Sequence, residues 1–134
     1  DGRLMSGGQM RRASLAIGIA LNPGILLLDE PTANLDIATR REIMAVLSDM
    51  EDIIQTAVIA THDMQLVCQW AERIIVLCNG QVVADGARDE IFARTDVVER
   101  VGIRPPEIFS MAQALDSRSM CYTIDEFLSS FQEV

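Results

Sequence analysis

The chain has 134 residues, of which 49% are hydrophobic and 23% are charged, and its formal net charge at pH 7 is −9. This length suits one ordinary domain, no apolar run reaches the roughly eighteen residues of a membrane span, and no signal peptide is visible. The acidic balance argues against a nucleic-acid partner. The excess of acidic residues lies in residues 49–134, and all eleven basic residues are arginines. Three cysteines without metal-ligand spacing indicate free thiols in a reducing cytosol.

A helix is predicted to begin at Ser6-Gly7-Gly8-Gln9, because Ser6 and Gln9 have the spacing of a capping box. Two glycines in a first turn cost roughly 1 kcal/mol each relative to alanine, but they leave backbone N–H groups that a ligand can approach closely. Such a start is either a plain capped helix or an anion site, above all for phosphate. The predicted apolar face of this helix is Ala13, Ala16, Ile17, Ala20 and Leu21, and Asn22-Pro23-Gly24 ends it.

Residues 25–28 are four aliphatic residues in a row, followed by Asp29, Glu30 and Pro31. An unbroken apolar run of this length predicts a strand that is buried on both faces, as in a parallel sheet covered by helices. The two carboxylates then fall at the carboxyl end of the strand, where open α/β sheets place their ligand sites. The alternative is a buried strand whose last residues emerge into solvent without a function.

The next segment repeats this arrangement of an apolar strand and a polar end. Asp36 is expected to cap a helix over residues 37–53, whose apolar face is Ile43, Val46, Leu47 and Met50 and whose charged residues Arg40, Arg41 and Glu42 face water. Residues 56–60 predict a second buried strand that ends in Thr61-His62-Asp63. A lone histidine is usually structural, but the place of His62 at a strand end indicates a functional residue.

The remaining residues predict a helix over 64–71, a strand over 74–78, a hairpin at Asn79-Gly80, and a return strand over 81–84 that turns out at Asp85-Gly86. Short helices are expected over residues 89–93, 97–101, 107–115 and 124–131, and Thr123 with Glu126 forms a capping box for the last. The predicted fold class is α/β: a parallel sheet with flanking helices, a β-hairpin, and an appended small helical subdomain. Two domains are expected, 1–86 and 87–134, and the second, acidic one is expected to dock rather than to catalyse.

Four of these segments together resemble the motifs of ABC-type ATPases. Leu4-Met5-Ser6-Gly7-Gly8-Gln9 resembles the signature motif, with Met5 where leucine is usual. Residues 25–30 resemble the Walker B strand with the catalytic glutamate, residues 33–36 resemble the D-loop, and His62 matches the switch histidine. The resemblance implies a partial P-loop NTPase (RecA-like) fold.

The family resemblance implies a head-to-tail dimer of two ABC ATPase domains with ATP between them. In that dimer Ser6, Gly7 and Gly8, with Gln9 in the same motif, would bind the γ-phosphate of ATP held by the partner domain. Asp36 would connect the two ATP sites.

The same resemblance assigns Asp29 to Mg²⁺, Glu30 to the attacking water, and His62 to holding the γ-phosphate and that water in line. Consecutive strand residues point to opposite faces. We therefore expect Asp29 and Glu30 to divide the metal and the water between them.

The sequence departs from the family in one respect: it has no lysine and no G-x-x-x-x-G-K-[ST] loop, which in P-loop enzymes contacts the phosphates. The glutamine loop is missing too, so we expect the second half of a nucleotide-binding domain. Residues 101–106 and 111–115 resemble the C-terminal extension of energy-coupling-factor and cobalt-type importer ATPases. That resemblance implies an ATP-hydrolysing importer subunit for a vitamin or metal ion, bound to an integral membrane subunit at the cytoplasmic face of the membrane.

Two alternatives stay open. An ABC ATPase outside transport would usually carry coiled-coil insertions, zinc cysteines or basic surfaces, and this sequence has none of them. A non-enzymatic interaction module that only offers its signature helix to a partner is favoured by the missing phosphate loop.

Overall fold

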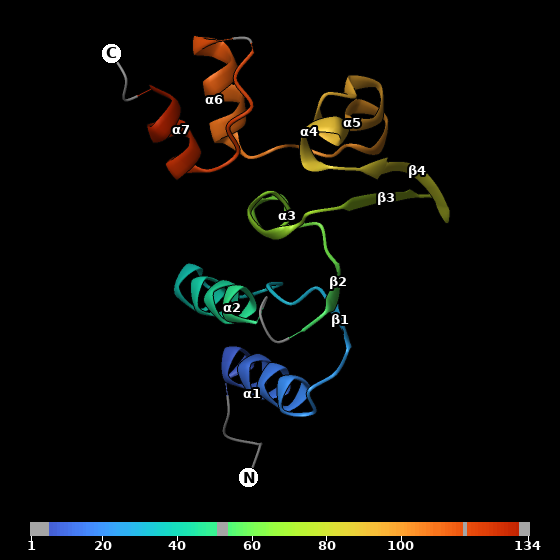
Figure 1. The fold of residues 1–134 in the computed structure, drawn as a ribbon, viewed down its shortest axis with the longest axis vertical. Helices are drawn as coiled ribbons and strands as arrows, with labels where there is room; N and C mark the ends of the chain where they lie inside the picture. The colour runs from blue at the N-terminus through green and yellow to red at the C-terminus, as the bar shows by residue number, and fades with distance from the viewer. Residues whose placement is uncertain (1–5, 51–53, 117, 132–134) are drawn as a thin grey trace. The chain divides into compact units, whose positions relative to one another are not determined.

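The computed structural model describes residues 6–50, 54–116 and 118–131, and these residues form two compact units, Asp1–Asp63 and Met64–Val134 (Figure 1). The sequence-based division at residues 86 and 87 follows motifs, whereas this division follows packing, so the predicted domains stay a prediction. Within the described part of the chain, no helix is long and apolar enough to cross a membrane.

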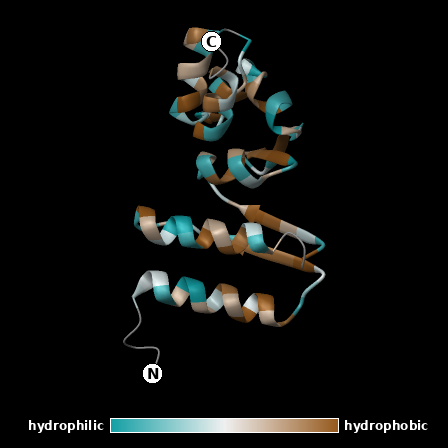
Figure 2. Cartoon of the chain, turned by 60° about the vertical axis from the view of Figure 1, so that its left-hand side comes forward, coloured by the Kyte–Doolittle hydropathy of each residue, from teal (hydrophilic) through white to brown (hydrophobic). Residues whose placement is uncertain are grey.

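The first unit is built from two helices and a pair of parallel strands. The elements follow the order α1 (Gly7–Ala20), β1 (Ile25–Asp29), α2 (Ile37–Asp49) and β2 (Thr56–Ala60). β1 and β2 pair in parallel, with α2 between them in sequence. α1 and α2 lie side by side along the strands in both views (Figures 1 and 2). The predicted parallel sheet with flanking helices is confirmed.

The prediction that these strands are buried on both faces is wrong for this chain. Leu26 of β1 is buried toward the helices, but Ile25, Leu27 and Val58 are exposed on the opposite face. β2 is at most half-buried along its length. Strand side chains alternate between two faces, and in this unit the helices cover only one of them. Figure 2 shows the resulting hydrophobic colour along both strands.

The two helices of the first unit use faces that differ in part from the predicted ones. In α1 only Leu15 is buried, while Ile17 and Leu21 are exposed. Arg11, Ser14, Leu15 and Gly18 of α1 share one helical stripe and line a groove together with residues 26–29. In α2 the predicted Ile43, Leu47 and Met50 are buried, Met44 joins them, and Val46 is only half-buried. Residues 51–53, predicted as helix, lie outside the described residues.

The second unit combines a β-hairpin with short helices. Its elements are α3 (Met64–Trp70), β3 (Ile74–Cys78), β4 (Gln81–Gly86), α4 (Arg88–Phe92), α5 (Thr95–Val101), α6 (Glu107–Leu115) and α7 (Ile124–Phe131). Asn79 and Gly80 both have positive φ, 50° and 74°, as a two-residue type I′ hairpin requires. The predicted hairpin is therefore confirmed.

One expectation for this hairpin is corrected by the structure. Asp85 and Gly86 continue β4 and pair with Ile75 and Ile74, so the turn expected at Asp85-Gly86 is wrong. Arg73 holds the strand end there by donating two hydrogen bonds, of 2.8 and 2.7 Å, to the Asp85 carboxylate. Within the described residues β3 pairs with β4 alone, in a sheet separate from β1 and β2.

An aromatic cluster forms one part of the core of the second unit. Phe92, Phe109 and Tyr122 pack with Cys68, and the Phe109 and Tyr122 rings stack with centroids 5.0 Å apart. The guanidinium of Arg88 lies 4.3 Å from the centroid of the Tyr122 ring. Burial raises the pKa of the Cys68 thiol to about 12, so this thiol stays protonated. All three cysteines are free, as predicted.

The exposed apolar face of β1 and β2 predicts self-association of the 134-residue chain, because Leu27, 72% exposed, lies beside Val58 on it and contiguous apolar surface favours contacts between proteins. We expect light scattering to report species larger than a monomer at micromolar concentration. Leu27→Lys should shift them toward the monomer. The matched control is Ile37→Lys, because Ile37 of α2 is also 72% exposed but lies off this face. A monomeric parent chain, or equal effects of both variants, would contradict this expectation.

Candidate functional site

The start of α1 contains the residues that resemble the signature motif. The Gln9 amide donates to the Ser6 hydroxyl at 3.3 Å, and the Ser6 amide donates to Gln9 Oε1 at 2.9 Å. The predicted capping box is therefore confirmed, and Ser6 and Gly7 are exposed beside it. Leu4 and Met5 lie outside the described residues. Phosphate binding by this helix start stays a prediction.

Gly8 allows α1 to approach α2 closely. A Cβ atom at Gly8 would lie 2.8 Å from Thr39 Cγ2, inside van der Waals contact, whereas a Cβ at Gly7 would meet nothing within 4 Å. The two glycines therefore differ in why a side chain is absent at each position. Gly8 is required by helix packing, and Gly7 leaves open space beside the helix start.

Thr39 connects this packing contact to Asp36. The carboxylate of Asp36 accepts from the Thr39 amide at 3.0 Å and from the Thr39 hydroxyl at 2.8 Å, which confirms Asp36 as the cap of α2. These two hydrogen bonds hold the pKa of Asp36 below its usual value. The start of α1 and the D-loop-like aspartate thus share one neighbour.

Asp29 and Glu30 lie in different local structures, because the backbone turns between them. β1 ends at Asp29, and Glu30 adopts a left-handed conformation with φ 45°. For a residue other than glycine this conformation costs on the order of 1–3 kcal/mol. The Glu30 amide nevertheless donates to the Ala60 carbonyl at 2.8 Å. Our expectation that strand alternation separates the two carboxylates is therefore wrong, since Glu30 has already left the strand.

The segment after β2 holds the Glu30 carboxylate on both oxygens. Glu30 Oε1 accepts from the His62 amide at 3.1 Å and lies 2.5 Å from His62 Nδ1. Glu30 Oε2 accepts from the Thr61 hydroxyl at 3.0 Å. The structure thus brings together Glu30 and His62, two residues that the sequence singled out separately. The His62 side chain is 85% exposed, so its ring also faces solvent.

These contacts decide the charge of Glu30. Burial raises its pKa, but the hydrogen bonds from His62 and Thr61 and the charge of His62 together outweigh burial, so the pKa of Glu30 lies below its usual value. Glu30 is therefore ionised at neutral pH. An ionised carboxylate is a hydrogen-bond acceptor only, which suits a group that orients a water molecule.

A second set of contacts, which we did not predict, anchors the same segment. The Thr32 hydroxyl donates to Asp63 Oδ2 at 2.9 Å, and Arg40 Nη1 lies 3.3 Å from the same oxygen. Thr32 is only 1% exposed. Arg40 was expected to face water, and that expectation is wrong because its guanidinium pairs with this carboxylate. The sequence did contain one signal for these contacts, because Asp63 is another acid at the carboxyl end of a strand.

The residues that resemble the signature motif and the Glu30–His62 pair are not in direct contact. Among the described residues, no hydrogen bond or ion pair joins Ser6, Gly7, Gly8 or Gln9 to either of them. This is compatible with the family resemblance, which assigns the two groups to different ATP molecules.

Asp29 fits a magnesium ion as a single protein ligand. In the described part of the chain, no three His, Cys, Asp or Glu side chains gather as a metal cage. Mg²⁺ at nucleotide sites needs no such cage, because it keeps several waters and phosphate oxygens and takes one or two carboxylates. Asp29 is exposed at the end of β1, and Arg11 contacts its backbone carbonyl at 3.3 Å rather than its carboxylate.

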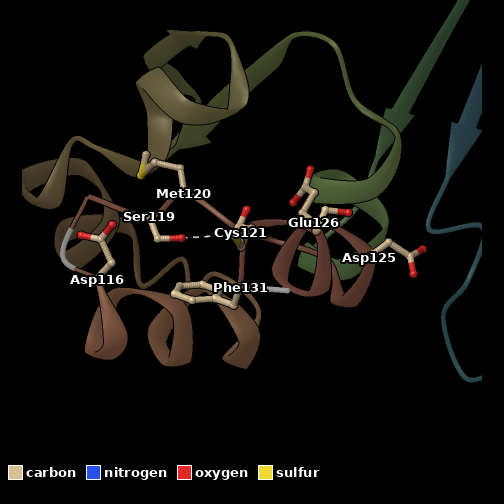
Figure 3. A pocket seen from close by; sticks show the side chains of 9 residues that line it. Asp116, Ser119, Met120, Cys121, Asp125, Glu126 and Phe131 are labelled. Carbon is tan, nitrogen blue, oxygen red and sulfur yellow. Dashed lines mark hydrogen bonds between the residues drawn. The ribbon is translucent and has the colours of Figure 1, made fainter. Parts of the chain in front are cut away.

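The second unit contains an open pocket of about 680 Å³ with none of these residues (Figure 3). Glu126, one of its acids, accepts from the Tyr122 and Thr123 amides at 2.7 and 3.1 Å and pairs with Arg88. The carboxylate of Glu126 therefore caps the start of α7, as the sequence predicted.

The following known proteins, to which this chain is similar, come from one family. The model of the ABC transporter family matches residues 1–33. The energy-coupling factor transporter ATP-binding protein EcfA2 of Streptococcus sanguinis is 38% identical over 128 residues, 92% of this chain and 46% of that protein. The cobalt import ATP-binding protein CbiO of Rhodobacter capsulatus is 36% identical over 81% of this chain and 39% of that protein. The chain therefore spans less than half the length of these relatives.

Solved structures agree with the sequence relatives. CbiO1 from Clostridium perfringens, described as part of the ABC transporter complex CbiONQ, is 37% identical with a TM-score of 0.59, over 78% of this chain and 42% of that one. A dimeric ATP-binding cassette in a post-hydrolysis state, bound to ADP and Pi, is 39% identical with a TM-score of 0.56, over 62% of this chain and 36% of that one.

The contrast between the two glycines gives a stability test. Gly8→Ala should lower the free energy of unfolding, because overpacking against Thr39 costs about 1–3 kcal/mol and outweighs a helix-propensity gain of at most about 1 kcal/mol. Gly7→Ala is the matched control and should be neutral or stabilising, because its Cβ enters open space. Urea unfolding followed by circular dichroism measures both. Equal stability of the two variants would rule out the close contact.

Proposed function

This chain belongs, by sequence and by fold, to the ATP-binding domains of ABC transporters, and from that premise we propose that it acts in an importer subunit that hydrolyses ATP. The observation that carries the proposal is the Glu30 carboxylate, held by the amide and ring of His62 at the ends of two parallel strands. The name of the cobalt import relative supports a metal ion as the transported substrate, and the resemblance to energy-coupling-factor ATPases implies a vitamin as the other candidate.

In the proposed reaction, Glu30 orients the attacking water. A carboxylate offers about four acceptor positions, and the contacts of Glu30 occupy two on Oε1 and one on Oε2. One position on Oε2 therefore stays available for a water, and the side chain is 32% exposed. Phosphoryl transfer depends mainly on such positioning and on charge stabilisation.

The other site residues take the roles that the family resemblance assigns. Asp29 would hold Mg²⁺, which when bound neutralises charge on the phosphates. His62 would contact the γ-phosphate through its exposed ring. Ser6, Gly7 and Gly8, with Gln9, would present the start of α1 to ATP bound by a partner domain, and Asp36 would connect the two ATP sites.

The proposed partners are a second ABC ATPase domain, in a head-to-tail dimer, and an integral membrane transporter subunit. One structural relative is described as a dimeric cassette and another as part of a transporter complex, which supports both partners. The subunit would then lie at the cytoplasmic face of the membrane, and residues 87–134 would serve docking.

A non-enzymatic interaction module is the second candidate. It is favoured by the sequence itself, which has neither a lysine nor a G-x-x-x-x-G-K-[ST] loop to contact the phosphates.

The 134-residue chain by itself should not hydrolyse ATP, because it lacks the loop that supplies most phosphate contacts in P-loop enzymes. A phosphate-release assay on the purified chain, with the Glu30→Gln chain as a control for contaminants, measures this. Turnover in the parent chain that disappears in the Glu30→Gln chain would contradict the expectation.

Asp29 and Glu30 should give different defects in a complete ATP-binding subunit that contains this stretch. Glu30→Gln keeps the shape and removes the charge, so ATP affinity should stay near the parental value while turnover falls by about 10²-fold or more. Asp29→Asn should instead weaken Mg²⁺-dependent ATP binding. Fluorescent-nucleotide titration and steady-state turnover separate the two. Parental turnover in Glu30→Gln, or loss of ATP binding in it, would exclude the role given to Glu30.

A further inference from the structure

The Thr61 hydroxyl makes two hydrogen bonds at the carboxyl end of β2. It donates to Glu30 Oε2 at 3.0 Å and accepts from the Asp63 amide at 3.0 Å. The hydrogen bond from the Asp63 amide closes a short turn over residues 61–63, and this turn fixes where the hydroxyl oxygen lies. The hydroxyl oxygen is therefore placed by a local structure that does not depend on Glu30, and its rotatable hydrogen is donated to Glu30 Oε2.

Oε2 is the oxygen of Glu30 with an acceptor position to spare. His62 uses Oε1 twice, through its amide and its ring, and within the described residues Thr61 is the one group that hydrogen-bonds Oε2. Rotation of the carboxylate about its terminal bond is broad and roughly two-fold when unrestrained. Together with the two contacts on Oε1, the donor on Oε2 restrains this rotation and so the direction of the remaining acceptor position.

We propose that Thr61 is a positioning residue for ATP hydrolysis: its hydroxyl orients Glu30 Oε2 so that the remaining acceptor position of that oxygen faces the attacking water. This inference rests on the proposed function, because it matters only if Glu30 orients a water. It assigns Thr61 no contact with nucleotide.

Contacts of Asp63 hold the segment that carries Thr61. The carboxylate of Asp63 is bound by the buried Thr32 hydroxyl and by Arg40, while its amide binds Thr61. Thr32, in the turn after β1, and Arg40 of α2 therefore hold the segment from which Thr61 reaches Glu30. Thr61 lies between a fixed anchor and the functional carboxylate.

The test uses the complete ATP-binding subunit that contains this stretch, measured for kcat, KM and nucleotide affinity. Thr61→Val keeps the β-branched shape and removes the hydroxyl, so kcat should fall by about tenfold to a hundredfold, the scale of a misplaced reacting group. KM and the affinity for a fluorescent ATP analogue should stay near parental values. Thr61→Ser retains the hydroxyl and should recover most of kcat.

Thr56→Val is the matched control. Thr56 begins β2, the strand that Thr61 follows; it is exposed, and its hydroxyl makes no hydrogen bond to the described part of the chain. This variant should hydrolyse ATP at the parental rate. A loss in Thr56→Val equal to that in Thr61→Val would show a general effect of the substitution on β2 and would overturn the inference.

A double-mutant cycle identifies the route of the effect. If Thr61 acts through Glu30, Thr61→Val should cost nothing further in a Glu30→Gln background, because the group it orients is already gone. Additive losses, a parental kcat in Thr61→Val, or a lost nucleotide affinity with failed rescue by Thr61→Ser would each overturn the inference. If the parent subunit and the Thr61→Val variant hydrolyse ATP equally well, only the inference about Thr61 is overturned and the proposed function stands. If the parent subunit hydrolyses no ATP, the inference and the proposed function are both overturned.

Discussion

The backbone turn at Glu30 is the constraint on which the rest of the site depends. A left-handed glutamate is unfavourable by itself, and it persists where surrounding contacts over-determine it. Here the Glu30 amide completes the ladder to Ala60, and its carboxylate is held by Thr61 and His62. The turn moves Glu30 out of line with Asp29 and toward the end of β2. Without it, Glu30 would continue β1 and point to the face opposite Asp29.

Local signals explain what the sequence predicted well. The bounds of β3, α6 and α7 match the expected ranges, because the Asn79-Gly80 hairpin, Pro105-Pro106 and the Thr123 capping box each act within a few residues. The capping boxes at Ser6 and Thr123 were visible for the same reason. Interactions between neighbours in sequence are legible from sequence alone.

Packing between elements explains what the sequence did not predict. The apolar pattern of α1 gave the right period but the wrong face, since Leu15 is buried and Gly18 lies beside Leu26, whereas Ile17 is exposed. The β1 run predicted two buried faces because four aliphatic residues do not reveal how many helices cover them. Arg40 looked like a solvent-facing charge, and only the fold places it beside Asp63. The Glu30–His62 contact was expected only in outline, as two polar strand ends at one edge.

Three acids at these strand and helix ends have one contact in common: each carboxylate accepts a hydrogen bond from a threonine hydroxyl. Thr61 binds Glu30, Thr39 binds Asp36, and Thr32 binds Asp63. A hydroxyl orients a carboxylate while leaving its negative charge in place, whereas a guanidinium would pair with that charge and compete with a metal ion or a water for the same oxygens. Glu30 combines its threonine with the ring of His62, and within the described residues neither Glu30 nor Asp36 has an arginine partner, whereas Asp63, to which we assign the anchoring role, has one.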